Sequence, residues 1–175
     1  MIRYFTIYFL FVAVLASSGF ATITTAQAQT PQLIGTYGDW SAYRFTENGN
    51  KVCYMVAQPE TAVGNYTKRG DIFALITHRP ADNTRNVFSY MTGYSYKEGS
   101  DVSVKIDNRN FNLFTQGDTA WAADAATDNN IAQAVQAGNR MIVKGTSSRG
   151  TATTDTFSLS GSTKAHNKIT AECGL

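Results

Sequence analysis

The sequence predicts an all-β domain, an antiparallel β-sandwich with one or two short helices, and three observations support this prediction. Residues 101–106 alternate strictly between polar and apolar side chains, as in a half-buried strand. Residues 72–76 and 141–143 are apolar on both faces, which suits strands that are covered on both sides of a sandwich. Gly, Asn, Asp and Thr separate these short stretches, which is typical of the turns between strands.

The beginning of the chain predicts a secretory signal peptide over residues 1–28. Arg3 precedes an apolar run at residues 4–16, and Ala26-Gln27-Ala28 supplies the small residues that signal peptidase needs. The apolar run is shorter than the roughly 20 residues of a membrane-spanning helix. We therefore expect residues 29–175 to form one exported domain, with no integral membrane span after cleavage.

The strands are expected in order along this domain. Turn-forming side chains at residues 107–110 are followed by Phe111 and Leu113, which continue the inward phase of residues 101–106 and so predict a hairpin. Further strand candidates are residues 39–45, 52–57, 87–92, 119–122 and 155–159. The longest loop is expected at residues 58–70, and long loops in compact domains often carry binding sites.

Two helices interrupt the strands. The first is predicted over residues 129–137, with Asp128 as its N-cap and Gly138 as its stop. The second follows Ser162, where a spacing of four residues places three side chains on one inward face: Ala165, Ile169 and Cys173.

The composition is that of an ordinary globular protein, with 43% hydrophobic and 16% charged residues. The net charge is +2, and removal of Arg3 with the signal peptide would lower it to +1. The basic residues are scattered, and the densest pair is Lys68-Arg69. This pattern argues against a nucleic-acid partner.

The two cysteines, Cys53 and Cys173, are expected to form a disulfide, because export places them in an oxidising compartment. They do not have the C-x-x-C spacing of a redox-active pair. The bond would tie an early strand to the C-terminus. On the chain-entropy model, a disulfide that closes a loop of about 100 residues stabilises the folded state by about 4.7 kcal/mol at most.

An ordered set of motifs spans nearly the whole exported part of the chain. Gly38-Asp39-Trp40 is followed by the glycine- and aromatic-rich segments 93–100 and 111–121, then by 145–151 and a stretch from Asp155 to a terminal Cys. In this order the motifs resemble the invasion-associated locus B (IalB) family of exported alphaproteobacterial proteins. The resemblance implies an immunoglobulin-like β-sandwich at the periplasm or cell surface, with some members linked to host-cell invasion. It implies no established enzyme activity and no catalytic or ligand-binding residue.

The most concentrated polar motif contains Arg149, Thr151 and Asp155. The planar guanidinium of Arg149 could bind a carboxylate or sulfate, with Thr151 and Asp155 completing a polar pocket. The alternative is a loop in which Arg149 pairs locally with Asp155.

Aromatic residues offer a second candidate surface. Tyr94 and Tyr96 share one face of an extended segment, which would be a contact surface if it is exposed. Trp40 and Trp121 could form a platform for sugars or peptides, but we expect both in the core, as is common for Trp in a β-sandwich.

A hydrolase would need a nucleophile, a base and an orienting acid, and Ser147 or Ser148, His166 and Asp155 supply the residue types. The serines lack the G-x-S-x-G spacing of a nucleophile elbow. We therefore expect no catalytic residues.

Four residues have side chains that can bind a metal ion: Cys53, His78, His166 and Cys173. Their spacings match no zinc pattern, and oxidised cysteines cannot be thiolate ligands. The sequence therefore predicts neither a metal nor a cofactor.

Together these features predict a non-enzymatic interaction protein that is located in the periplasm or the medium, or is associated with the outer membrane. Its partner would be a protein or another component of the envelope or host surface. A chaperone-like binder in envelope homeostasis is the alternative, which an uncovered strand edge or apolar patch would favour.

Overall fold

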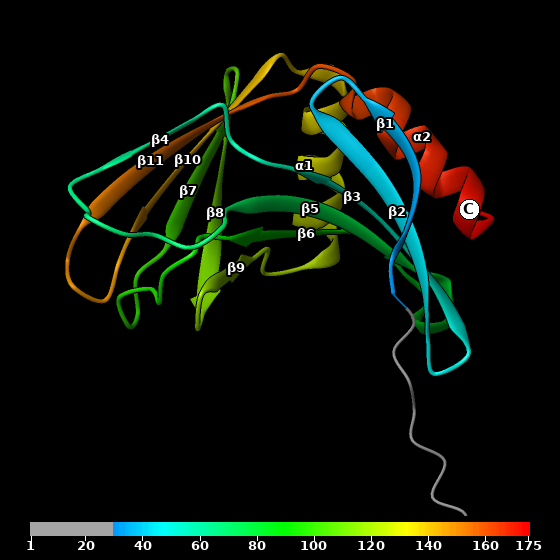
Figure 1. Ribbon diagram of the computed structural model, residues 1–175, viewed down its shortest axis with the longest axis horizontal. Helices are drawn as coiled ribbons and strands as arrows, with labels where there is room; N and C mark the ends of the chain where they lie inside the picture. The colour runs from blue at the N-terminus through cyan, green and yellow to red at the C-terminus, as the bar shows by residue number, and fades with distance from the viewer. Residues whose placement is uncertain (1–29) are drawn as a thin grey trace, which may run out of the picture.

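The computed structural model describes residues 30–175, which form eleven antiparallel strands and two α-helices (Figure 1). The predicted signal peptide, residues 1–28, lies outside this part of the chain. The strands are β1 (Gln32–Tyr37), β2 (Trp40–Glu47), β3 (Asn50–Ala57), β4 (Thr61–Gly64), β5 (Phe73–Arg79), β6 (Thr84–Met91), β7 (Val102–Ile106), β8 (Arg109–Gln116), β9 (Thr119–Trp121), β10 (Arg140–Thr146) and β11 (Ala152–Ser158). The helices are α1 (Ala125–Ala137) and α2 (Ser162–Cys173), and a 3₁₀ turn, η1 (Pro80–Asp82), joins β5 to β6.

The strands form two half-sheets that meet at β8. The first has the order β1-β2-β3-β5-β6-β9, and the second has the order β7-β10-β11-β4. Residues 109–113 of β8 pair with β7, whereas residues 114–116 pair with β9, so β8 leaves one half-sheet and enters the other. A strand that switches sheets in this way makes the corner between two packed layers. The predicted antiparallel all-β fold with two short helices is confirmed, and its layers are joined into one bent sheet.

Both half-sheets and both helices contribute to one hydrophobic core. The ring of Tyr90 on β6 packs edge-on against Phe157 on β11, with centroids 6.1 Å apart. Trp40 is fully buried, as expected, and its indole N–H donates to the carbonyl of Ser158 at 3.1 Å. The core position expected for Trp121 is wrong, because Ala120 is the inward-facing residue of β9 and Trp121 remains partly exposed.

Helix α1 begins earlier than predicted. Asp124 is the N-cap, and its carboxylate accepts a hydrogen bond from the Thr127 amide at 2.7 Å. The expected cap, Asp128, lies within the first turn and is buried, and it accepts from the Phe88 amide at 2.8 Å. The capping role predicted for Asp128 is therefore wrong, because this side chain fastens the helix to β6. The helix ends at Gly138, as expected.

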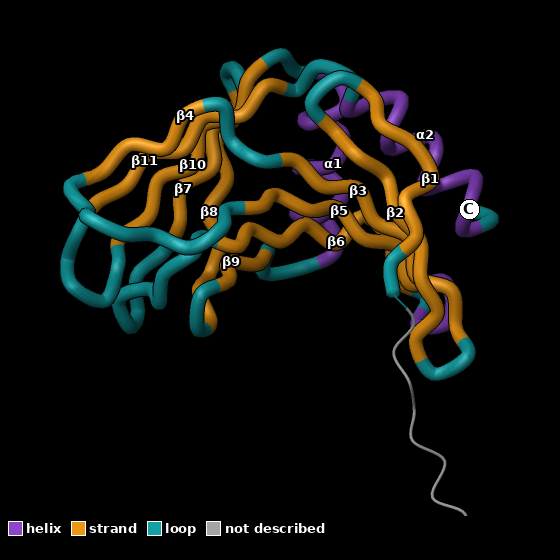
Figure 2. Tube along the Cα trace, in the orientation of Figure 1, coloured by secondary structure: helices purple, strands orange, loops and turns teal. Residues whose placement is uncertain are grey.

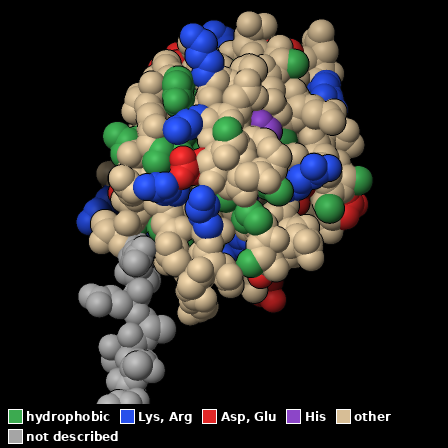
Figure 3. Space-filling view, turned by 90° about the vertical axis from the view of Figure 1, so that its right-hand side faces the viewer, with side chains coloured by type: hydrophobic (Ala, Val, Ile, Leu, Met, Phe, Trp, Pro, Cys, Tyr) green, Lys and Arg blue, Asp and Glu red, His purple; other side chains and the backbone are tan. Residues whose placement is uncertain are grey.

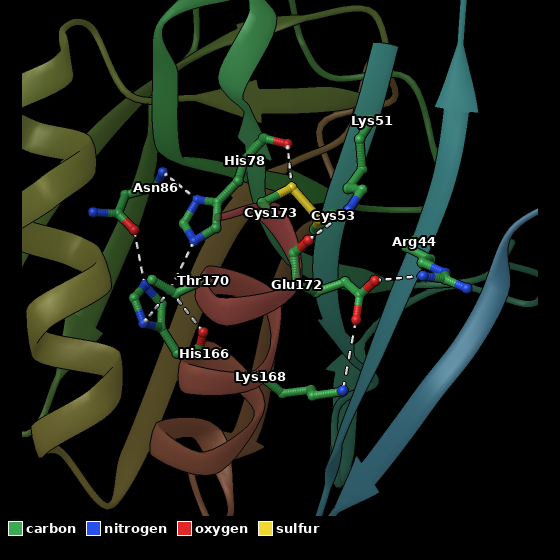
Figure 4. The surroundings of a disulfide bond; sticks show 10 residues. All are labelled: Arg44, Lys51, Cys53, His78, Asn86, His166, Lys168, Thr170, Glu172 and Cys173. Carbon is green, nitrogen blue, oxygen red and sulfur yellow. Dashed lines mark hydrogen bonds and ion pairs between the residues drawn. A yellow bond between two sulfur atoms is a disulfide. The ribbon is translucent and has the colours of Figure 1, made fainter. Parts of the chain in front are cut away.

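Helix α2 packs against β1, β2, β3 and β5, and a disulfide between Cys53 on β3 and Cys173 fixes its C-terminal end (Figure 4). The predicted inward face of this helix is confirmed. Glu172 forms an ion pair with Arg44 at 2.5 Å, and its carbonyl accepts from Lys51 at 2.9 Å. Figure 3 shows the face of the molecule that lies on the right in Figure 1. On this face, acidic side chains lie among basic ones and apolar side chains form small separate patches. Neither helix of residues 30–175 is long and apolar enough to cross a membrane.

Candidate binding pocket

Three loops meet at one end of the second half-sheet (Figure 2). They follow β4, β6 and β10, and backbone hydrogen bonds hold them together. The Gly70 amide donates to the Gly93 carbonyl at 2.9 Å, and the Ser148 amide donates to the Ser95 carbonyl at 2.8 Å. Part of the predicted loop 58–70 is instead strand β4, which pairs with β11 and brings the rest of the segment to this end.

The three loops enclose a polar hollow of about 610 Å³, which we name the loop pocket. Its lining comes from residues 65–70, 93–95 and 147–153. Three of the five predicted binding residues line it: Tyr94, Arg149 and Thr151. Two basic residues that sequence reasoning did not assign to a site, Lys68 and Arg69, line it as well.

The floor of the loop pocket is a buried ion pair. Both terminal nitrogens of Arg69 donate to the carboxylate of Asp155, each at 2.7 Å. The side chain of Arg69 is 4% exposed and that of Asp155 is 0% exposed. A bidentate pair that is shielded from water is both strong and directional. The local pairing of Arg149 with Asp155 is therefore wrong, because Asp155 is buried and pairs with Arg69, whereas Arg149 is exposed and forms no ion pair within residues 30–175.

Side chains from β6 and the residue after it complete this floor. Arg69 also donates to the carbonyl of Thr92 at 2.7 Å and to its hydroxyl at 2.9 Å, and the Tyr90 hydroxyl donates to Asp155. Burial and the neighbouring carboxylate of Asp155 raise the pKa of Tyr90, so its phenol stays protonated. Burial alone would lower the pKa of Arg69, but the hydrogen bond and charge of Asp155 raise it.

Two tyrosine rings hold Arg69 in place. Its guanidinium lies 4.8 Å from the ring centroid of Tyr94 and 5.5 Å from that of Tyr66, within the range of cation–π attraction. The Tyr94 hydroxyl lies 2.6 Å from the hydroxyl oxygen of Thr153. Tyr94 is partly exposed, whereas Tyr96 is 7% exposed and packs edge-on against Tyr94. Tyr96 and Asp155 therefore lie behind the pocket wall and not on its surface.

The rim of the loop pocket is positively charged. Lys68 and Arg149 are exposed on two different loops, and neither forms an ion pair within residues 30–175. No Asp or Glu is among the lining residues. Since Arg69 is neutralised by Asp155, Lys68 and Arg149 supply the uncompensated charge.

One glycine is required where two of the loops touch. Gly93 has a φ of +72°, and a Cβ built on it would lie 2.4 Å from the carbonyl oxygen of Gly70. A larger residue would therefore separate the loops and open the wall of the pocket.

The hydrolase residues are not brought together. The hydroxyl of Ser147 accepts from the Thr151 amide at 3.1 Å, and Asp155 is held by Arg69 and Tyr90. His166 is on α2, where its ring bonds to the side-chain oxygen of Asn86 at 2.8 Å. None of these hydrogen bonds joins a serine to His166 or His166 to Asp155, as a triad requires.

The four residues of the hypothetical metal site do lie near one another (Figure 4). The rings of His78 and His166 are 5.4 Å apart, and His78 is paired with Cys53 across β3 and β5. However, the two sulfur atoms are bonded to each other, so they are not thiolate ligands. Residues 30–175 contain no group of three or more His, Cys, Asp or Glu side chains placed to hold a metal ion.

These features define a disulfide-bonded, all-β domain with a polar pocket between its loops. The family model described as "Invasion associated locus B (IalB) protein" matches residues 40–170, and the chain belongs to this family. The crystal structure of invasion associated protein B from Bartonella henselae shares the fold, with a TM-score of 0.57 and 19% sequence identity. The match covers 82% of this chain and 97% of the Bartonella chain. Comparison with curated protein sequences finds no match.

Proposed function

We propose that this chain is an exported binding protein without catalytic activity, and that it recognises an envelope or host-surface component through the loop pocket. The observation that carries the proposal is the pairing of a fixed, buried floor with a charged, open rim. Arg69 and Asp155 satisfy each other below the surface, while Lys68 and Arg149 face solvent and have no acidic partner among residues 30–175. Such a site is shaped before any ligand arrives, which reduces the entropy lost on binding.

Two further features support export and recognition. Residues 1–28 have the pattern of a cleaved signal peptide, which would deliver the chain to the periplasm or the medium. The related Bartonella henselae protein is called invasion associated, which supports an interaction with a host surface or with the outer membrane that faces it. The dispersed hydrogen bonding of Ser147, His166 and Asp155 supports a role without chemistry.

A second candidate function, capture of unfolded envelope proteins by strand addition, is favoured by β4. This strand is at the edge of the sheet, and Val63 on it is 63% exposed. The edge is short, however, and the hydroxyl of Tyr66 already donates to the carbonyl of Ala62 at 2.8 Å. We therefore favour the loop pocket over this edge.

The test combines cell fractionation with capture of partners. We expect the chain in the periplasm or medium, shortened by cleavage after Ala28. Ser148→Trp should fill the loop pocket from an exposed position and abolish capture of a partner from envelope or host-membrane extracts. Ser103→Trp, at an exposed position on β7 outside the pocket, is the matched control and should capture normally.

Two results would contradict the proposal. One is an uncleaved chain that remains in the cytoplasm. The other is equal capture by the Ser148→Trp variant and the wild type. Loss of capture by Val63→Glu, with Ser148→Trp unaffected, would transfer the role to the β4 edge.

A further inference from the structure

We propose that the ligand of the loop pocket is an anionic saccharide, a sugar that carries carboxylate, phosphate or sulfate groups. This inference rests on the proposed function and assigns the chemical class of its ligand. Three properties of the pocket carry it: the charge at the rim, the chemistry of the lining, and the size and rigidity of the hollow.

The charge at the rim selects an anion. Lys68 and Arg149 reach the pocket from separate loops, and both are free of ion pairs within residues 30–175. The lining contributes no carboxylate that could offset them. Arg69 adds no net charge, because Asp155 holds it in a bidentate pair. A ligand with one or more negative groups would therefore gain charge-assisted hydrogen bonds from both sides.

The lining favours a sugar over an acidic peptide. No Leu, Ile, Val, Met or Phe side chain of the described residues lines the pocket, so it offers no aliphatic surface to the apolar side chains of a peptide. Instead the lining is rich in hydroxyl groups, which donate and accept hydrogen bonds as sugar hydroxyls do. These groups include those of Tyr66, Thr67, Tyr94, Ser147, Ser148 and Thr151.

The hollow has the size and rigidity of a small-ligand site. Its volume of about 610 Å³ lies within the roughly 300–1,000 Å³ of typical ligand pockets. The buried Arg69–Asp155 pair and the contact between Gly70 and Gly93 fix the positions of the loops. Binding would therefore require little ordering of the protein itself.

The experiment is a calorimetric titration of the disulfide-bonded domain with three saccharide probes and, for comparison, a poly-glutamate peptide. A sulfated disaccharide from heparin represents a host source, and the phosphorylated core oligosaccharide of lipopolysaccharide represents a bacterial source. The same disaccharide without its sulfate groups, with its carboxylate reduced to an alcohol and its amine acetylated, is the neutral counterpart. The double variant Lys68→Gln/Arg149→Gln removes the rim charge. Lys105→Gln/Arg140→Gln removes the same charge from exposed positions at the other end of the second half-sheet.

We expect at least one anionic probe to bind, and the source follows from which one binds more tightly. The neutral counterpart should bind about tenfold or more weakly than the sulfated disaccharide, if that is the probe that binds. The Lys68→Gln/Arg149→Gln variant should bind each active anionic probe about tenfold or more weakly than the wild type does. The Lys105→Gln/Arg140→Gln variant should stay within about twofold of the wild type, since distant exposed charges are largely screened by salt. Circular dichroism spectra and urea midpoints should match across all variants. A loss of affinity can then be attributed to the removed rim charges and not to unfolding.

The inference is overturned if neither anionic probe binds, if both rim and control variants bind like the wild type, or if a poly-glutamate peptide binds as tightly as the saccharides. Its failure is distinct from that of the proposed function. If no saccharide binds but Ser148→Trp still abolishes capture, the pocket recognises another class of ligand. If Ser148→Trp captures normally, the pocket is not the binding site.

Discussion

At the scale of single residues, Asp155 is the position on which the loop pocket depends. It faces the core from β11, on the same side as Phe157 and Thr153, and its carboxylate has no contact with solvent. Arg69 reaches it across 86 positions of sequence and is itself almost fully buried. Removal of either charge would leave the other buried without compensation, which is far more costly than loss of a surface pair.

Asp155→Asn should therefore lower the free energy of unfolding by about 3–5 kcal/mol. Urea denaturation followed by tryptophan fluorescence measures this loss. Asp101→Asn is the matched control, because Asp101 is exposed and forms no ion pair within the described residues, and it should change stability by about 0.5 kcal/mol or less. Equal stability of the two variants would refute a structural role for the buried pair.

The site residues differ in how far the sequence could reveal them. Tyr94, Arg149 and Thr151 are found in polar or glycine-rich connections, where binding residues are expected, and they do line the pocket. Arg69 was missed because its partner is remote in sequence and nothing nearby indicates that it is buried. One signal was available: the alternation that places Phe157 in the core also places Asp155 there, and a buried carboxylate requires a cationic or hydrogen-bonding partner.

At the scale of elements, the contact between α2 and the first half-sheet contains two buried histidines. The backbone N–H of Asn86 donates to Nδ1 of His78 at 3.0 Å, and Nε2 of His78 lies 3.1 Å from the Thr170 hydroxyl (Figure 4). Nδ1 is therefore an acceptor, and its protonation would break the bond from Asn86. Burial, followed by the proximity of His166 and Arg85, lowers the pKa of His78 to about 4.

This arrangement predicts that acid weakens the fold. In the unfolded chain, His78 takes up a proton near its ordinary pKa of about 6.5, whereas the folded chain does not until about pH 4. The stability present at neutral pH is thus lost as the pH falls between these values, by about 3 kcal/mol in total. Urea midpoints at pH 7 and at about pH 4.5 measure the loss, and His78→Asn, which keeps an acceptor for Asn86, should reduce the difference between them. An unchanged difference in that variant would show that His78 is not responsible.

The regular elements were largely predictable, and the exceptions have physical causes. The buried face of β7 follows directly from its alternation, and the inward face of α2 follows from the spacing of Ala165, Ile169 and Cys173. Strands β1 and β4 were not predicted. Strand β4 was missed because Thr61–Gly64 shows no alternation and owes its conformation to pairing with β11, and β1 likewise pairs with only one neighbour, β2. The start of α1 was misplaced because Asp124 and Asp128 are both suitable caps, and only the contact with β6 distinguishes them.

At the scale of the whole molecule, the Cys53–Cys173 bond connects the first half-sheet to the last helix across 120 residues. Long closed loops are those whose crosslinking restricts the unfolded chain most. We expect Cys53→Ala/Cys173→Ala to lose about 2–5 kcal/mol of stability, measured by urea denaturation. Reductant should destabilise the wild type by a similar amount and leave the double variant unchanged. Thiol labelling of the denatured, unreduced protein should find no free cysteine, and two labelled cysteines would contradict the bond.

The bent sheet also places the loop pocket at one end of the molecule. Strand β8 joins the half-sheets, α1 and α2 cover the first, and the three loops of the pocket meet beyond the ends of β4 and β10 in the second. The core and the disulfide therefore fix the frame, while the loops supply the side chains that line the pocket. This division is common where a rigid sheet scaffold presents recognition loops.

The most direct test of the proposed binding role is photo-crosslinking of the chain in cells, with benzoylphenylalanine at position 148 in the loop pocket or at position 105 on β7. We expect a crosslinked adduct from position 148, its loss when Lys68 and Arg149 are changed to Gln, and no adduct from position 105. Adducts from position 105 alone, or from both positions equally, would show that recognition takes place elsewhere on the molecule.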